Sequence, residues 1–173
     1  IYTHIMGQNL HHWSMTKVGA NDQSREVLFR LQDEIRAAKN VQIGYFTNAQ
    51  FRTPTLGQRQ VGQTLRIFPT TNDANYVQYR LASFSTGMQL RRAEISGSGR
   101  TGGRTVATHL TNNPAMFAFE DFWGTPLTEL SANRIVAVTL DFKQFQYPIT
   151  QVGSNYYYDY YRLQTRISKR AVE

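Results

Sequence analysis

Three histidines near the start of the sequence, His4, His11 and His12, come closest to a metal-binding arrangement. On a helix, His4 and His11 would lie two turns apart on the same side. A zinc site would also need a carboxylate or a further histidine on that face, and Asp22 is too far along a straight helix to supply it. We therefore interpret these histidines as surface residues and predict no metal site.

Two pairs of neighbouring acidic residues are the candidates for acid–base catalysis. Asp33 and Glu34 fall in a predicted helix, where adjacent side chains diverge around the axis. Glu120 and Asp121 fall in a predicted strand, where adjacent side chains point to opposite faces. Neither pair brings two carboxyl groups to one substrate, so neither suits general acid–base catalysis. We expect the helical pair to form ion pairs with nearby arginines instead.

Motifs of other enzyme and cofactor sites do not occur in the sequence. The chain has no cysteine, which excludes disulfides, thiolate zinc sites and cysteine nucleophiles. The Gly-rich run at residues 96–103 lacks the Gly-Lys-[Ser/Thr] ending of a phosphate-binding loop, and no G-x-S-x-G or EF-hand pattern is present. No acidic cluster offers the roughly six to eight oxygens that calcium takes. We predict no enzyme activity, no cofactor and no bound metal.

Arginine and tyrosine interleave in the later part of the sequence, and proteins that bind single-stranded nucleic acid use this combination to stack on bases and neutralise phosphates. The formal net charge of +7 at pH 7 is compatible with such a partner. The candidate contacts are Arg91, Arg92, Arg100, Arg104, Tyr160, Arg162, Arg166, Lys169 and Arg170. Because the basic residues are scattered, we favour a Tyr-rich strand with one face in the core and the other in solvent. Polysaccharide binding by exposed tyrosines and Trp123 is a weaker alternative.

The sequence predicts a strongly amphipathic helix in the first part of the chain. In residues 24–43 apolar side chains recur at three- and four-residue steps, which places them on one helical face, and charged residues occupy the rest. The residues predicted to pack this helix on a sheet are Val27, Leu28, Leu31, Ile35 and Ala38. We expect the helix to continue to about residue 41, with Gly44 just past its end.

The first twenty residues also favour a helix, with a broader apolar stripe that includes Ile1, Ile5 and Trp13. A continuous helix from residue 1 to about residue 40 would be roughly 60 Å long, which exceeds the diameter of the body that follows. Such a helix must protrude or be covered by another chain. These three residues are therefore our candidates for contact with other subunits.

The sequence after the helix is strand-like, rich in aromatic residues and punctuated by Gly, Pro and Asn. We predict strands at residues 64–68, 76–84, 88–95, 106–110, 116–122, 134–142 and 156–168. No repeat or linker divides them, and a length of 173 residues suits one domain. The predicted fold is α+β in a single domain over residues 1–173. A long N-terminal helix (residues 1–41) packs on the antiparallel β-sheets of a β-rich body (residues 42–173).

Three stretches of the sequence, in this order, resemble the type IV pilin-like proteins and the type II secretion pseudopilins, the larger J-type minor pseudopilins especially. The helix end that precedes their first strand is matched by LQDEIRAAKNV. Their late hairpin and the strand after it are matched by MFAFEDFWGTPLTELSANRIVAVTLDF. Their closing strand is matched by YYRLQTRISKR. The combination in order is more specific than any one of the three.

The resemblance implies a structural subunit with a pilin-like (pseudopilin) fold, not an enzyme. Such proteins are made as prepilins and assemble through their N-terminal helices into a short filament used in protein transport. Minor members initiate the filament, form its tip or contact cargo. The implied partners are other pilin-like subunits and, through an N-terminal segment, the bacterial inner membrane. The body would then lie in the periplasm or at the cell surface.

The start of the sequence departs from the family pattern, which has a processed N-terminal Phe, a Glu a few residues later and an apolar stretch of about 20 residues. None of the three occurs in this sequence, so no assembly residue of the family is assigned to the chain. On the resemblance, Ile1 lies just beyond that anchor. Residues 1–40 would then form the soluble half of the long pilin helix.

Overall fold

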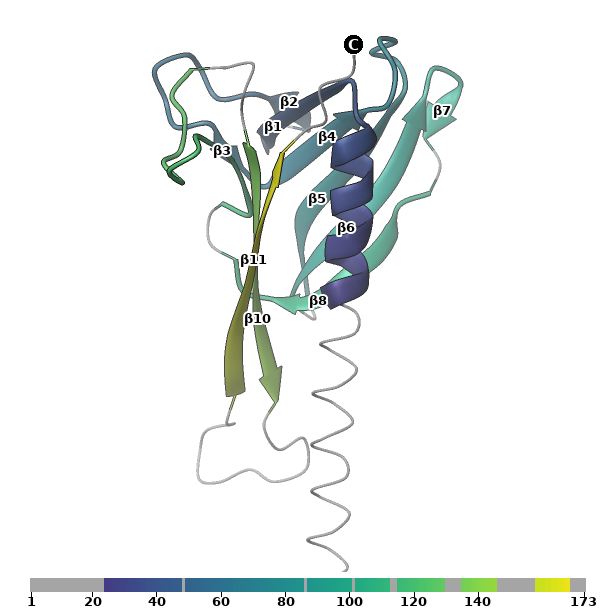
Figure 1. Ribbon diagram of the computed structural model, residues 1–173. Coiled ribbons are helices and arrows are strands. Elements are labelled where there is room, and N and C mark those ends of the chain that lie inside the picture. Colours follow the sequence, from purple (N-terminus) through teal and green to yellow (C-terminus); the bar gives the residue numbers. More distant parts are fainter. Residues whose placement is uncertain are drawn as a thin grey trace, which may run out of the picture.

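The computed structural model describes residues 24–47, 49–85, 87–100, 102–112, 115–129, 135–145 and 158–168. These ranges contain one helix of 14 residues, at residues 24–37, and a mostly antiparallel sheet that forms a half-barrel (Figure 1). The fold is α+β with a dominant sheet, and to that extent the predicted fold class is confirmed. The candidates for subunit contact, Ile1, Ile5 and Trp13, lie outside the described ranges.

The strands pair into one continuous sheet. In chain order they are β1 (Asn40–Thr47), β2 (Gln50–Arg52), β3 (Val61–Gly62), β4 (Thr64–Phe68), β5 (Tyr76–Phe84), β6 (Gly87–Ser96), β7 (Gly99–Arg100), β8 (Arg104–Leu110), β9 (Phe117–Glu120), β10 (Ile135–Phe145) and β11 (Tyr158–Ser168). The order across the sheet is β2-β1-β4-β5-β6-β8-β10-β9-β3, while β11 pairs with β10 and β7 pairs with β6. Since β11 follows β10 along its whole length, β8 and β9 share the opposite edge of β10.

Most of the longer strands lie where the sequence predicts them. β4 and β5 have the predicted bounds, and β5 forms the predicted hairpin with β6, in which Phe84 pairs with Gly87. β9 ends at Glu120, whereas the prediction extends to residue 122, because Asp121 starts a tight turn. Strands β1, β2, β3 and β7 are absent from the prediction. The last three have only two or three residues each, which is too few for a periodic pattern.

The helix ends at residue 37, so the prediction that it continues to about residue 41 is wrong. The amide of Lys39 already donates to the carbonyl oxygen of Phe68 at 2.8 Å, and from there the chain bonds to β4. Val41 and Ile43 are buried in β1. Their β-branched side chains suit a strand, and pairing with β4 outweighs the helical spacing. Gly44, predicted to follow the helix end, lies inside β1.

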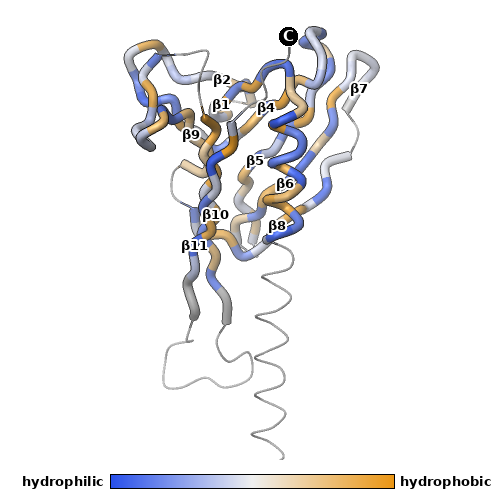
Figure 2. The backbone as a smooth tube through the Cα atoms, viewed as in Figure 1, coloured by the Kyte–Doolittle hydropathy of each residue, from blue (hydrophilic) through white to orange (hydrophobic). Residues whose placement is uncertain are grey.

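The core lies between the helix and the inner face of the sheet and continues along β9 and β10 (Figure 2). Burial of each large apolar side chain contributes about 1.5–3 kcal/mol before conformational entropy is counted. The alternation predicted for β10, which places every second residue from Val136 to Phe142 inside, is confirmed. The strand residues of this core are Val41, Ile43, Leu65, Ile67, Tyr79, Leu81, Leu90, Val106, Ala107, Leu110, Phe117, Phe119, Val136, Val138, Leu140, Phe142 and Ile167.

The chain turns between β3 and β4 at a point where two backbones nearly touch. A Cβ atom on Gly62 would overlap the carbonyl oxygen of Gly44. A Cβ atom on Gly44 would overlap the carbonyl oxygen of Arg52 and lie 2.8 Å from the ring of Phe51. Neither glycine has a positive φ, so the lack of space, and not the backbone conformation, requires glycine here. This close approach explains a glycine within β1.

We expect Gly44→Ala to lower the free energy of unfolding by about 2 kcal/mol or more, because the added methyl group must displace β2. Urea denaturation of the purified chain measures the change. Gly102→Ala is the matched control, since a Cβ atom there meets nothing within 4 Å. We expect that control to change stability by less than about 0.5 kcal/mol. Equal losses for the two variants would contradict the steric explanation.

Candidate functional site

The helix packs on the sheet along one face, and the structure places the five predicted packing residues on or beside that face. Leu31, Ile35 and Ala38 are fully buried, and Val27 is nearly so. Leu28 is partly buried and packs against the same core. Ala38 lies just past the last helical residue, where its amide donates to the carbonyl oxygen of Ile35 at 3.3 Å. The opposite face of the helix therefore faces solvent.

A partly buried ion pair joins the helix to β6. The Oε1 atom of Glu34 accepts hydrogen bonds from Nε and Nη2 of Arg92, at 3.0 and 2.8 Å. Nη1 of Arg92 forms a second ion pair with Glu94, at 2.7 Å. The side chains of Glu34 and Arg92 are only 21% and 16% exposed. Burial by itself lowers the pKa of Arg92, but hydrogen bonds to the two carboxylates outweigh it and raise that pKa above its ordinary value.

Tyr79 of β5 lies beside this ion pair and is fully buried. Burial raises the pKa of its phenol well above the ordinary value, the carboxylate of Glu34 raises it further, and Arg92 opposes the shift. The Tyr79 hydroxyl and the Oε2 atom of Glu34 are buried without a well-formed hydrogen bond to any described residue. Tyr79 is therefore a neutral, buried hydroxyl beside the Glu34–Arg92 pair at the helix–sheet interface.

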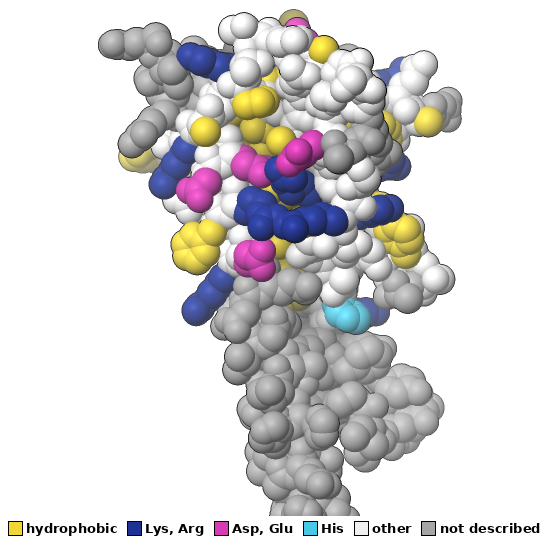
Figure 3. Space-filling view, turned by 90° about the vertical axis from the view of Figure 1, so that its right-hand side faces the viewer, with side chains coloured by type: hydrophobic (Ala, Val, Ile, Leu, Met, Phe, Trp, Pro, Cys, Tyr) yellow, Lys and Arg dark blue, Asp and Glu magenta, His cyan; other side chains and the backbone are white. Residues whose placement is uncertain are grey.

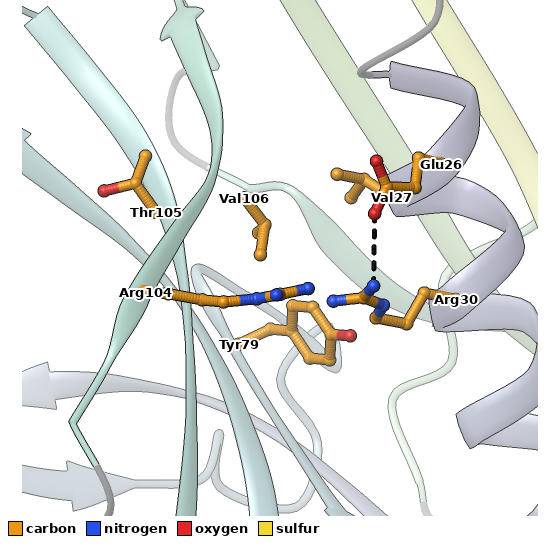
Figure 4. A pocket seen from close by; sticks show the side chains of 7 residues that line it. All are labelled: Glu26, Val27, Arg30, Tyr79, Arg104, Thr105 and Val106. Atoms are coloured by element: carbon orange, nitrogen blue, oxygen red, sulfur yellow. Dashed lines mark hydrogen bonds and ion pairs between the residues drawn. The ribbon is translucent and has the colours of Figure 1, made fainter.

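A groove of about 200 Å³ runs between the helix and β8, and we call it the Arg30–Arg104 groove. On the side of the molecule turned to the viewer in Figure 3, Lys and Arg side chains form a band with acidic side chains above and below it. In Figure 4, Arg30 from the helix and Arg104 from β8 reach toward each other above the ring of Tyr79. The lining residues are Glu26, Val27, Arg30, Tyr79, Arg104, Thr105 and Val106. The groove is thus a polar site with a mixed charge.

The residues named as alternative nucleic-acid contacts are divided between different parts of the sheet. Arg91 and Arg92 are neighbours in β6 and so point to opposite faces. Arg92 is engaged with Glu34, while Arg104 lines the groove. Nη2 of Arg91 donates to the carbonyl oxygen of Gly103 at 2.6 Å. The two arginines of β6 therefore do not contribute to one basic face.

The basic residues of β11 are paired with acidic residues of the same sheet. Arg162 forms an ion pair with Asp141 at 2.6 Å, and Arg166 forms one with Glu120 at 3.0 Å. Nothing is described for four further candidates, namely the side chains of Arg100 and Tyr160 and the whole of Lys169 and Arg170. The described candidates are thus in part neutralised by the protein itself, which weakens the nucleic-acid hypothesis.

Two aromatic side chains stand out from the surface between β9 and β10. Phe122 and Trp123 are 77% and 85% exposed, and their rings form an edge-to-face pair with centroids 5.5 Å apart. Residues 121–125, which we call the aromatic turn, are closed by a bond from the amide of Thr125 to Oδ1 of Asp121 at 2.8 Å. Nη2 of Arg166 donates to the backbone oxygens of Asp121 and Phe122, at 2.6 and 3.1 Å. The turn is therefore braced from β11.

The described ranges contain no group of three or more His, Asp or Glu residues able to hold a metal ion. His4, His11 and His12 lie outside these ranges. No helix among the described residues has both the length and the apolar character needed to cross a membrane. Comparisons with protein families, curated proteins and solved structures find no match to this chain.

We expect Glu34→Gln to lower the free energy of unfolding by about 2 kcal/mol, because Arg92 then keeps only its more exposed partner, Glu94. Glu26→Gln is the matched control on the same helix, since it removes the more exposed pair with Arg30. We expect that control to lower stability by less than about 0.5 kcal/mol. Urea denaturation measures both. A loss for Glu34→Gln no larger than the control's would show that the buried pair does not fix the helix.

We expect Tyr79→Phe to make the stability less sensitive to high pH. The pKa of Tyr79 is raised in the folded chain, so above its ordinary value of 10.0 the unfolded chain releases this proton and the folded chain keeps it. The stability that comes from this difference in pKa is fully present below about pH 10. Above that pH the free energy of unfolding falls by about 1.4 kcal/mol per pH unit. Urea denaturation between about pH 9 and 11 compares the two chains. Parallel pH profiles would contradict the assignment.

Proposed function

We propose that the chain is a structural subunit of a pilin-like or pseudopilin filament, in a type II secretion or type IV pilus-like system. The observation that carries the proposal is a helix held on an antiparallel sheet by an apolar face and by the partly buried Glu34–Arg92 pair. A helix held in this way moves with the sheet as one body, and a filament assembled through helices needs that property. The order of elements, a helix followed by a β-rich body, also agrees with the family that the sequence resembles.

The outward face of the helix offers a surface to a neighbouring subunit. Phe29 is 66% exposed on this face, and the exposed residues Arg25, Asp33 and Arg36 lie around it at helical spacing. Aromatic and arginine side chains are enriched in protein–protein interfaces. In this proposal the face contacts other pilin-like subunits, together with the apolar stripe expected within residues 1–13.

The proposal places the chain in the bacterial cell envelope. It would be anchored in the inner membrane through an N-terminal segment, with its body in the periplasm or at the cell surface. Its role would be to initiate the filament, to form the tip or to contact cargo. The aromatic turn supports the last two roles, because it presents two exposed rings between β9 and β10.

Photocrosslinking from the outward face tests the proposal. Phe29 is replaced by p-benzoylphenylalanine in the full-length protein, expressed in its native cell. We expect a light-dependent adduct with a pilin-like subunit, identified by mass spectrometry, because this ring lies on the proposed contact surface.

The matched control places the same photoreactive residue at Leu56, which is also highly exposed but lies between β2 and β3. We expect no pilin-like adduct from that position. Adducts of equal yield from the two positions, or none with a pilin-like protein from position 29, would rule out the proposed contact.

A further inference from the structure

The Arg30–Arg104 groove holds two cationic side chains that converge without sharing an acidic partner. Figure 4 shows their guanidinium groups approaching each other from the helix and from β8. Arg30 pairs with Glu26 at 3.1 Å, and the Glu26 side chain is 70% exposed. The side chain of Arg104 forms no hydrogen bond or ion pair with any residue that the structure describes. Among the described residues, Arg104 therefore has no counter-charge of its own.

The other carboxylates near the groove are already engaged. Glu34 and Glu94 both bind Arg92, so neither neutralises Arg104. The Glu26 pair is a surface pair, which contributes little and competes with solvent. Like charges that converge repel each other, and the repulsion grows where apolar walls limit hydration, as the two valines of this groove do. A shared anion between the two guanidinium groups would relieve this repulsion.

The floor of the groove is formed by an uncharged side chain, Tyr79. Tyr79 is fully buried, and its hydroxyl lies beside the Glu34 carboxylate. Because the pKa of Tyr79 is raised, the hydroxyl keeps its proton at any ordinary pH. The floor therefore adds no charge of its own, and an anion in the groove would be held by the two arginines.

We propose that the Arg30–Arg104 groove binds an oxyanion, a carboxylate or a phosphate group, held between the two arginines. A guanidinium group presents parallel N–H donors that match the oxygens of either group, and two such groups can hold one anion from both sides. A volume of about 200 Å³ admits a small acid or the end of an acidic side chain, and it is too small for a nucleotide. This inference does not depend on the filament proposal.

Thermal unfolding in the presence of inorganic phosphate or succinate, with chloride at equal ionic strength as the reference, tests the site. We expect a saturable rise in the unfolding midpoint of about 3–5 °C at ten times the dissociation constant. Isothermal titration calorimetry with the same two anions gives the affinity. We expect Arg104→Gln to lower that affinity at least tenfold. Arg104→Lys keeps the charge but not the paired donors, so we expect an intermediate loss.

Arg80→Gln is the matched control. Arg80 is an exposed arginine of the same sheet, and as the neighbour of Tyr79 in β5 it points to the opposite face. We expect this variant to bind both anions as the wild-type chain does. The control is needed because phosphate also stabilises proteins in general by exclusion from their surface.

A response to one anion only supports the proposal and identifies the ligand class as carboxylate or phosphate. The proposal is overturned by the absence of a saturable shift with either anion. It is also overturned if Arg104→Gln retains the wild-type shift, or if Arg80→Gln loses it.

Discussion

Glu34 and Arg92 meet across 58 positions of the chain, and the placement of the helix depends on that contact. Apolar burial holds the helix against the sheet, but it is not directional, so Leu31 and Ile35 alone would allow the helix to slide or rotate. Two hydrogen bonds from one guanidinium group to one carboxylate oxygen remove this freedom. Any other placement would leave a half-buried charge without its partner, which is costly. With the helix fixed, Arg30 faces β8 and Phe29 faces solvent.

The sheet itself is built around a second tight contact, at Gly44 and Gly62. Across the sheet, the order of paired strands begins with β2 and β1, passes through β10 and ends at β3. Along the chain, β3 leads directly into β4, and at this point Gly62 lies against the backbone of Gly44. The two ends of the half-barrel are therefore brought together where side chains are absent. Because β1 also follows the helix after a gap of only two residues, this corner and the helix end form one connected unit.

The sequence predicts those parts of the fold whose burial follows a local period. β5 and β10 alternate and were therefore recognisable, as was the apolar face of the helix. The end of the helix was not recognisable from the sequence, because Val41 continues the helical spacing. Only the pairing of residues 40–44 with β4 places Val41 in a strand. The Glu34–Arg92 pair has no local signal on the helix, where neighbouring arginines are equally good partners for Glu34. The sequence of β6 does indicate such a pair. Arg92 lies two residues after the buried Leu90 and so on the same, core-facing side of the strand. A charged side chain on that side needs an acidic partner from the element that covers it.

Phe122 and Trp123 are held in exposed positions by bonds that do not involve their rings. Arg166 binds the backbone of the aromatic turn and is itself fixed by the ion pair with Glu120. Most of the backbone freedom of the turn is therefore lost when the chain folds, and little remains to be lost when another surface covers the rings. Association at this place would need no prior ordering of a loop. Its rate would be set by encounter and orientation, and its lifetime by the surface area that the two rings bury.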